Sequence, residues 1–146
     1  MNNIVKDILK NVIKDNLIYI ENKFKRVKID VGLSMNAPNS EMWLRKDDDL
    51  IVFGFDPCNE CHESFIENNF EMSKRYPQYI FINPDRIFKT FFPIKCALSN
   101  CEPQYKKFHV TSNDLGCSSL YKPNWFPILT EYDVPCITLK DFFDLF

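Results

Sequence analysis

Residues 50–55 form an uninterrupted apolar run, Leu-Ile-Val-Phe-Gly-Phe, between a triplet of aspartates and Asp56-Pro57. A strand with one solvent-facing side alternates polar and apolar residues, whereas a strand covered on both sides is apolar throughout. The run therefore predicts a strand buried on both faces, as in a parallel sheet. Because parallel strands are joined by long crossovers, this segment alone favours an α/β fold.

The flanking sequence supplies helices and further strands. Apolar residues spaced by three and four over residues 4–20 predict an amphipathic helix, and alternation over residues 27–31 predicts a strand. Ser40 is expected to cap a short helix reaching residue 45, and residues 59–74 are expected to be helical. Residues 79–82 are expected to form a third strand. The alternating order predicts a Rossmann-like parallel sheet.

Beyond residue 91 the pattern changes to short apolar runs at residues 94–98, 107–111 and 118–121, separated by polar turns. These predict an added antiparallel hairpin or meander. Residues 134–139 predict another strand, and Thr138 is expected to cap a last helix starting near Lys140. The 146 residues fit a single domain. It divides into an amino-terminal helix (1–24), an α/β unit (25–85) and a hairpin region with the last helix (86–146).

Composition narrows the class of partner. The net charge is −2 and the basic residues form no long stripe, which argues against nucleic acid and against a membrane surface. The longest apolar run is far shorter than the roughly 20 residues that span a bilayer. The six cysteines occur in a chain rich in core residues, so we interpret them as reduced thiols of a cytoplasmic protein.

Two acids and a glycine mark the expected binding site. Ligands of an open parallel sheet bind at the carboxyl ends of its strands, where Asp30, Gly32 and Asp56 are expected to lie. A carboxylate there can accept hydrogen bonds from ribose hydroxyls, and a glycine lets the backbone approach the ligand. The alternative is that both acids only end their strands in turns.

The scarcity of glycine indicates which nucleoside cofactor would fit. The chain has only three glycines and lacks the G-x-G-x-x-G turn that cradles a pyrophosphate. It also lacks the G-x-x-x-x-G-K-[ST] phosphate loop. S-adenosylmethionine carries no phosphate, so the sequence favours it over NAD or ATP.

Several motifs in order resemble the FkbM-type methyltransferases over roughly residues 25–146. They are Ile29-Asp30-Val31-Gly32-Leu33-Ser34-Met35-Asn36-Ala37-Pro38, Val52-Phe53-Gly54-Phe55-Asp56-Pro57, Cys96-Ala97-Leu98-Ser99-Asn100, Gly116-Cys117-Ser118-Ser119-Leu120-Tyr121-Lys122-Pro123 and Ile137-Thr138-Leu139-Lys140-Asp141-Phe142. The common family loop reads D-x-G-A-N-x-G, and here Leu33-Ser34 replaces Ala-Asn and the second glycine is absent. The resemblance implies part of a class I methyltransferase fold.

The resemblance also implies roles for individual residues. Asp30, Gly32 and Asn36, with Ser34 in the same loop, would bind the methionine part of S-adenosylmethionine. Asp56 would bind the ribose. Ala97 and Leu98 would lie near the cofactor. The implied reaction is O-methylation of a small molecule or sugar, with no residue assigned as the catalytic base.

In the FkbM-type family, the last of these motifs is followed by another strand, which pairs beside the first strand of the sheet. This sequence stops at Phe146, before such a strand. We therefore expect a truncated methyltransferase. The first strand would then lie at an exposed, apolar edge, which favours self-association or a complementing chain.

A second reading rests on the cysteines. Cys58, Cys61 and His62 form a C-x-x-C-H cluster that Cys96 and Cys101 would complete as a zinc site, and the same cluster is a haem-attachment signature. The simpler interpretation is a pair of thiols at the start of a helix. The alternative function is therefore a non-catalytic interaction or metal-binding module. His109 lies in an alternating run and is interpreted as a strand residue, not a base.

Overall fold

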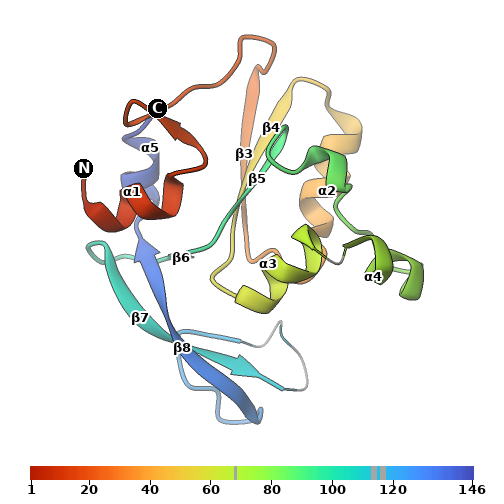
Figure 1. Cartoon of the computed structure of the whole chain (residues 1–146), viewed down its shortest axis with the longest axis vertical. Coiled ribbons are helices and arrows are strands. Elements are labelled where there is room, and N and C mark those ends of the chain that lie inside the picture. Colours follow the sequence, from red (N-terminus) through yellow and green to blue (C-terminus); the bar gives the residue numbers. More distant parts are fainter. Residues whose placement is uncertain (68, 113–114, 116–117) are drawn as a thin grey trace.

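The computed structural model describes residues 1–67, 69–112, 115 and 118–146. At its centre is a parallel sheet in the order β3-β4-β5, made of β3 (Arg26–Val31), β4 (Leu50–Phe55) and β5 (Phe91–Ile94) (Figure 1). The predictions of strands over residues 27–31 and 50–55 are confirmed. The chain is a mixed α/β protein whose parallel sheet is compatible with a Rossmann-like unit.

All six residues of β4 are buried, as the apolar run predicts. Leu50 and Val52 join the core beneath α2 (Pro38–Lys46) and α3 (Asn59–Ile66). Ile51, Phe53 and Phe55 join a second core beneath α1 (Asn3–Leu9) and α5 (Leu139–Phe143). Helices therefore cover both faces of the sheet (Figure 1), because successive side chains of a strand point to opposite faces.

The helix predicted over residues 4–20 is wrong beyond Leu9. After α1 the chain forms a small hairpin of β1 (Ile13–Lys14) and β2 (Leu17–Ile18). Asp15 and Asn16 at its turn have φ angles of 52° and 64°. Two successive residues at positive φ give the tight turn that matches strand twist, and Asp and Asn tolerate that conformation. This turn overrides the helical spacing of the apolar residues.

The helix after β3 begins earlier than predicted, and Ser40 does not cap it. Pro38 occupies its first turn, and Ala37, with φ of 44°, is the capping residue without a side-chain hydrogen bond. Proline suits this position because its missing N–H would have no helical partner there. Ser40 instead points into the core and bonds to Asp30.

The helix predicted over residues 59–74 occurs as two helices, α3 and α4 (Asn69–Arg75), with residue 68 outside the described residues. The strand predicted over residues 79–82 is wrong. That segment is irregular and precedes the 3₁₀ turn η1 (Pro84–Arg86). Ile82 N–H donates to the carbonyl of Asn36 at 2.8 Å, and the Asn36 amide donates to the carbonyl of Ile80 at 2.7 Å. These bonds tie the segment to a loop, and β5 takes the third place in the sheet.

The strand predicted over residues 107–111 is confirmed within β7 (Gln104–Thr111), but its main partner is not the run at residues 118–121. β7 pairs antiparallel with β8 (Ile128–Ile137), which has β6 (Ala97–Leu98) parallel on its other side. Within the described residues, the 118–121 run contributes a single bridge, between Ser119 and His109. β8 starts earlier than the strand predicted from residue 134. His109 on β7 lies opposite Glu131 on β8, and its Nδ1 is 2.9 Å from the carboxylate. It is a strand residue, as expected.

The last helix confirms its predicted cap. Thr138 accepts from the Asp141 N–H while the Asp141 carboxylate accepts from the Thr138 N–H, a reciprocal capping box. None of the helices in the described ranges has both the length and the apolar character needed to cross a bilayer.

Candidate functional site

A cavity of about 490 Å³ opens at the carboxyl ends of β3 and β4, where the hairpin approaches the sheet. Five of the seven sequence-predicted cofactor residues line it: Gly32, Ser34, Asp56, Ala97 and Leu98. They come from three separate segments of the chain. The sheet topology and the hairpin bring them together, because the carboxyl ends of parallel strands meet at one edge.

The loop after β3 has the backbone geometry expected of a close-approach turn. Gly32 has φ of 80°, and its N–H donates to the carbonyl of Phe55 at 2.8 Å. A Cβ built on Gly32 would meet no atom within 4 Å, so the glycine borders open space. Ser34 also has positive φ, at 58°, and is exposed, while Leu33 between them is buried. The loop thus presents backbone to the cavity and anchors itself through one apolar side chain.

Asp56 ties this loop to the end of β4. Its Oδ2 accepts hydrogen bonds from the N–H groups of Leu33 at 2.8 Å and Ser34 at 3.3 Å. Its Oδ1 accepts from the Cys58 N–H at 2.9 Å. Burial raises the pKa of the Asp56 carboxyl, and the three amides oppose that shift because they stabilise the ionised form. Through these three hydrogen bonds, the carboxylate fixes the loop after β3 against the start of α3, and both segments line the cavity.

Asp30 is the first predicted site residue that the fold keeps away from the cavity. It is buried near the end of β3, and Ser40 Oγ donates to its Oδ2 at 2.6 Å. It does not line the cavity. The side chain points toward α2, because alternate residues of a strand face opposite sides.

Asn36 is the second such residue. Its side-chain amide and its carbonyl both bond to residues 80–82, and it borders a separate cavity of about 510 Å³ with Met35 and Tyr79. These hydrogen bonds to residues 80–82 direct the Asn36 side chain away from the cavity at the ends of β3 and β4. The Gly116-Cys117 part of the family-like motif lies outside the described residues.

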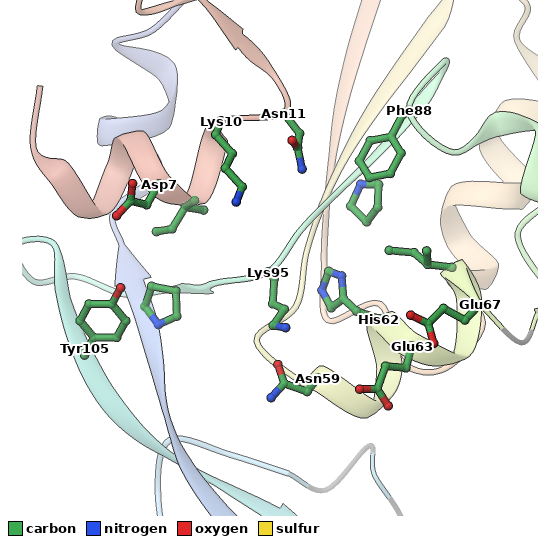
Figure 2. A pocket seen from close by; sticks show the side chains of 14 residues that line it. Asp7, Lys10, Asn11, Asn59, His62, Glu63, Glu67, Phe88, Lys95 and Tyr105 are labelled. Carbon is green, nitrogen blue, oxygen red and sulfur yellow. The ribbon is translucent and has the colours of Figure 1, made fainter.

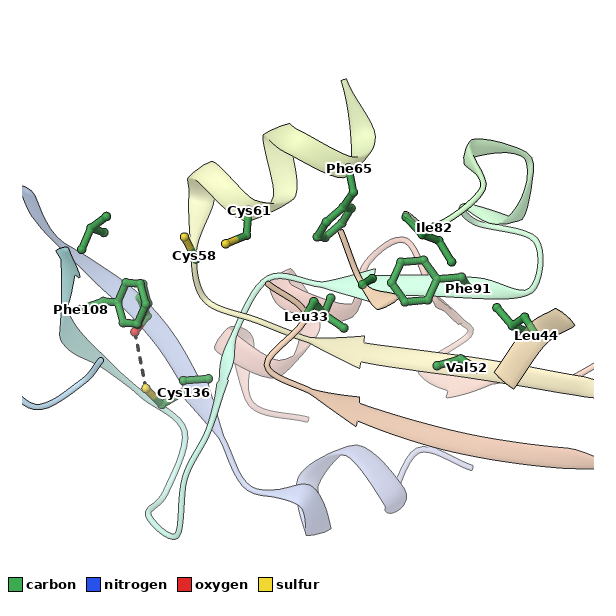
Figure 3. Close-up of a cluster of buried hydrophobic side chains, with 14 of the residues drawn as sticks. Leu33, Leu44, Val52, Cys58, Cys61, Phe65, Ile82, Phe91, Phe108 and Cys136 are labelled. Carbon is green, nitrogen blue, oxygen red and sulfur yellow. Dashed lines mark hydrogen bonds between the residues drawn. The ribbon is translucent and has the colours of Figure 1, made fainter. Parts of the chain in front are cut away.

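Three cysteines line the cavity that the cofactor prediction did not include: Cys58, Cys61 and Cys96. The C-x-x-C spacing in the sequence is the signal for the first two, but the spacing alone does not place them beside Asp56. Cys58 precedes α3 as its capping residue and Cys61 lies in its first turn. Figure 3 shows both at one end of the core beneath α3.

The atoms of Asp56, Cys58 and Cys61 that can ligate a metal lie within 4.8 Å of one another, and all three residues are buried. A hydrogen bond with Cys58, followed by burial, raises the pKa of the Cys61 thiol. His62 does not join this group. Its Nε2 lies 2.7 Å from the carbonyl oxygen of Asp56, and burial lowers its pKa to about 4, so the ring is neutral near neutral pH.

A larger pocket of about 550 Å³ lies among α1, α3 and the hairpin, and contains none of the seven predicted residues. Figure 2 shows His62 and Lys95 beside it, with Asp7, Lys10 and Glu63 on its walls. Charged groups of both signs line it. We place the candidate site at the smaller cavity because the carboxyl ends of the parallel strands open there.

The fold and cavity together define a mixed α/β protein with a cavity at the carboxyl ends of two parallel strands. Searches against protein-family profiles, curated proteins and solved structures found no significant match to this chain.

Proposed function

We propose that the chain binds S-adenosylmethionine in the cavity at the carboxyl ends of β3 and β4 and takes part in methyl transfer to a hydroxyl group. The observation that carries the proposal is the convergence of Gly32, Ser34 and Asp56 with Ala97 and Leu98 on one cavity. The resemblance to the FkbM-type methyltransferases gives the same cofactor.

The cavity has the size and chemistry of a small-molecule site. Its volume of about 490 Å³ lies within the usual range of about 300–1,000 Å³ for ligand pockets. Phe55, Leu98 and Leu120 supply apolar wall, while Asp56, Ser118 and Ser119 supply polar groups. An adenosyl group needs both kinds of wall, because its ring is apolar on its faces and its ribose carries hydroxyls.

Asp56 is the residue assigned to the ribose. An ionised carboxylate has about four acceptor positions, and backbone amides occupy three of those of Asp56. One ribose hydroxyl would donate to the remaining position. The same amides keep the carboxylate oriented before the ligand arrives, which lowers the entropic cost of binding.

The proposed reaction requires the acceptor hydroxyl to lie in line with the methyl–sulfur bond at close approach. The proposed acceptor is a small molecule or sugar. The side chains of the cavity do not single out a catalytic base, so we assign none. We propose that the residues of this cavity position the cofactor and the acceptor.

Calorimetric titration of the chain with S-adenosylhomocysteine, in a metal chelator, tests the proposal. Val31 and Val27 lie on the same face of β3 and are 62% and 39% exposed, but only Val31 lines the cavity. Val31→Trp should obstruct the cavity and weaken binding at least about tenfold, a free-energy loss of about 1.4 kcal/mol.

Val27→Trp is the matched control, because it adds the same side chain to the same strand away from the cavity. It should leave the affinity within about twofold of wild type, or about 0.4 kcal/mol. Absence of binding by the wild-type chain, or equal loss in the two variants, would contradict the proposal.

A second candidate is a metal-binding module without methyl transfer. The specific observation that favours it is the group formed by Asp56, Cys58 and Cys61. Binding of a metal without any binding of S-adenosylhomocysteine would select this candidate.

A further inference from the structure

Two thiols and a carboxylate converge at the start of α3. The Sγ atoms of Cys58 and Cys61 and a carboxylate oxygen of Asp56 all lie within 4.8 Å of one another. Ligands of a tetrahedral zinc ion with Zn–S bonds of about 2.3 Å lie about 3.8 Å apart. Small side-chain rotations would therefore bring the three donors to bonding distance of one ion.

The surrounding backbone positions all three donors. The Cys58 N–H and the amides of Leu33 and Ser34 orient the Asp56 carboxylate. Cys58 and Cys61 are separated by less than one helical turn, so α3 keeps them on one side. Bonds from neighbouring backbone groups to a ligating side chain are the usual support of a protein metal site.

From this geometry we propose that Asp56, Cys58 and Cys61 bind a thiophilic divalent cation of the zinc class. Thiolates favour zinc-class ions, whereas magnesium and calcium take oxygen ligands. On binding, the ion displaces the thiol protons to solvent, and the two thiolates and the carboxylate offset its charge. The evidence for this metal site does not depend on the proposed nucleoside binding.

The ligand set differs from a C-x-x-C-H arrangement. His62 is held at 2.7 Å from the Asp56 carbonyl and is not in the group. Cys101 Sγ lies 3.1 Å from Ser99 Oγ, also outside it. All three proposed ligands line the 490 Å³ cavity, so a fourth position on the ion faces space that water or a small ligand can enter. Three protein ligands with an open position are typical of reactive zinc sites.

Asp56 would serve both the metal ion and the ribose. A carboxylate bound to a cation cannot also accept a ribose hydroxyl at the same oxygen, so the metal and a nucleoside should compete for the cavity.

Titration of the full-length, reduced chain with cobalt(II) tests the metal site without any nucleoside. Wild type should develop a thiolate-to-cobalt charge-transfer band that saturates at one equivalent and is displaced by zinc. Cys58→Ser and Cys61→Ser should each lose most of the band. Cys101→Ser, the matched control outside the group, should keep it.

A measurement on wild type alone covers the case in which a buried variant fails to fold. Zinc should protect Cys58 and Cys61 from alkylation, located by mass spectrometry, while Cys101 is modified at an unchanged rate. No cobalt band in wild type, a band that survives both Cys58→Ser and Cys61→Ser, or zinc protection confined to other cysteines would overturn the proposal. Because the nucleoside titration contains a chelator and this one contains no nucleoside, either proposal can fail alone.

Discussion

Ser40 donates a hydrogen bond of 2.6 Å to the buried carboxylate of Asp30, linking α2 to β3. The family resemblance predicts that the same aspartate contacts a cofactor, but the cavity at the end of β3 does not include it. In the structure it joins the first helix of the parallel unit to its first strand. We therefore expect Asp30 to affect stability more than ligand binding.

Ser40→Ala removes the hydroxyl partner of a buried carboxylate. Hydrogen bonds to charged groups contribute about 1.5–3 kcal/mol, so the free energy of unfolding should fall by about 2 kcal/mol in urea denaturation. Asn39→Ala changes an exposed neighbour on the same helix and should alter stability by less than about 0.5 kcal/mol. Equal effects of the two changes would contradict the assigned role of Ser40.

Gly54 lies in β4 where a side chain has no room. A Cβ there would come within 2.7 Å of Leu33 Cδ2 and 2.8 Å of Phe91 Cε2. Gly54→Ala should therefore destabilise the fold by about 1–3 kcal/mol through overpacking, measured by thermal or urea denaturation. It should also shift Leu33 and the loop that borders the cavity.

Gly32→Ala tests a different constraint, since a Cβ there meets nothing within 4 Å but the residue has φ of 80°. Gly32→Ala should lower the free energy of unfolding by about 1 kcal/mol through backbone strain, in the same denaturation experiment.

The crowding explanation for Gly54 can be checked directly. A crystal structure of Gly54→Ala with Leu33 unmoved would argue against it.

Phe142 on α5 is the centre of an aromatic cluster. Its ring centroid lies 5.1 Å from those of Phe53 and Phe55 and 5.3 Å from that of Phe146, and it is fully buried. Phe142→Ala should lower the free energy of unfolding by about 3–5 kcal/mol because it leaves a cavity. Phe143→Ala, at a neighbouring residue that is 47% exposed, should cost much less in the same denaturation experiment.

The outer edge of β3 should promote self-association. In the described part of the chain, β4 is the only strand that pairs with β3, and Val27 and Val31 are exposed along it. Free strand edges with apolar residues recruit other chains. Light scattering should show an average mass that rises with concentration.

Charges on that edge should suppress the association. Val27→Lys combined with Val31→Lys should lower the average mass toward that of a monomer. Leu129→Lys, at a site on β8 that is 61% exposed, should not. A monomer at every concentration for the wild-type chain would contradict this prediction.

The candidate site was predictable where local sequence determines backbone shape. Gly32 and Asp56 could be placed at the ends of their strands, because strand ends can be located from the apolar pattern. The sequence does not show that the side chains of Asp30 and Asn36 point away from the cavity. Their directions depend on hydrogen bonds to Ser40 and to residues 80–82, respectively. The proximity of Cys58 and Cys61 to Asp56 depends on the geometry of the turn between β4 and α3.

For the fold, the sequence by itself determined the buried strand at residues 50–55, the strand at residues 27–31 and the Thr138 cap. Each depends on burial or hydrogen bonding within a few residues. Only the tertiary structure decided that Phe91–Ile94, and not residues 79–82, forms the third strand of the sheet. It also decided that residues 13–18 form a hairpin. For residues 79–82 the outcome depends on a distant backbone group, because the Ile82 N–H donates to the carbonyl of Asn36. For residues 13–18 the local turn competes with a helical spacing of apolar residues, and the Ile18 N–H donates to the distant carbonyl of Leu145 at 2.7 Å. The local sequence pattern contains neither long-range bond.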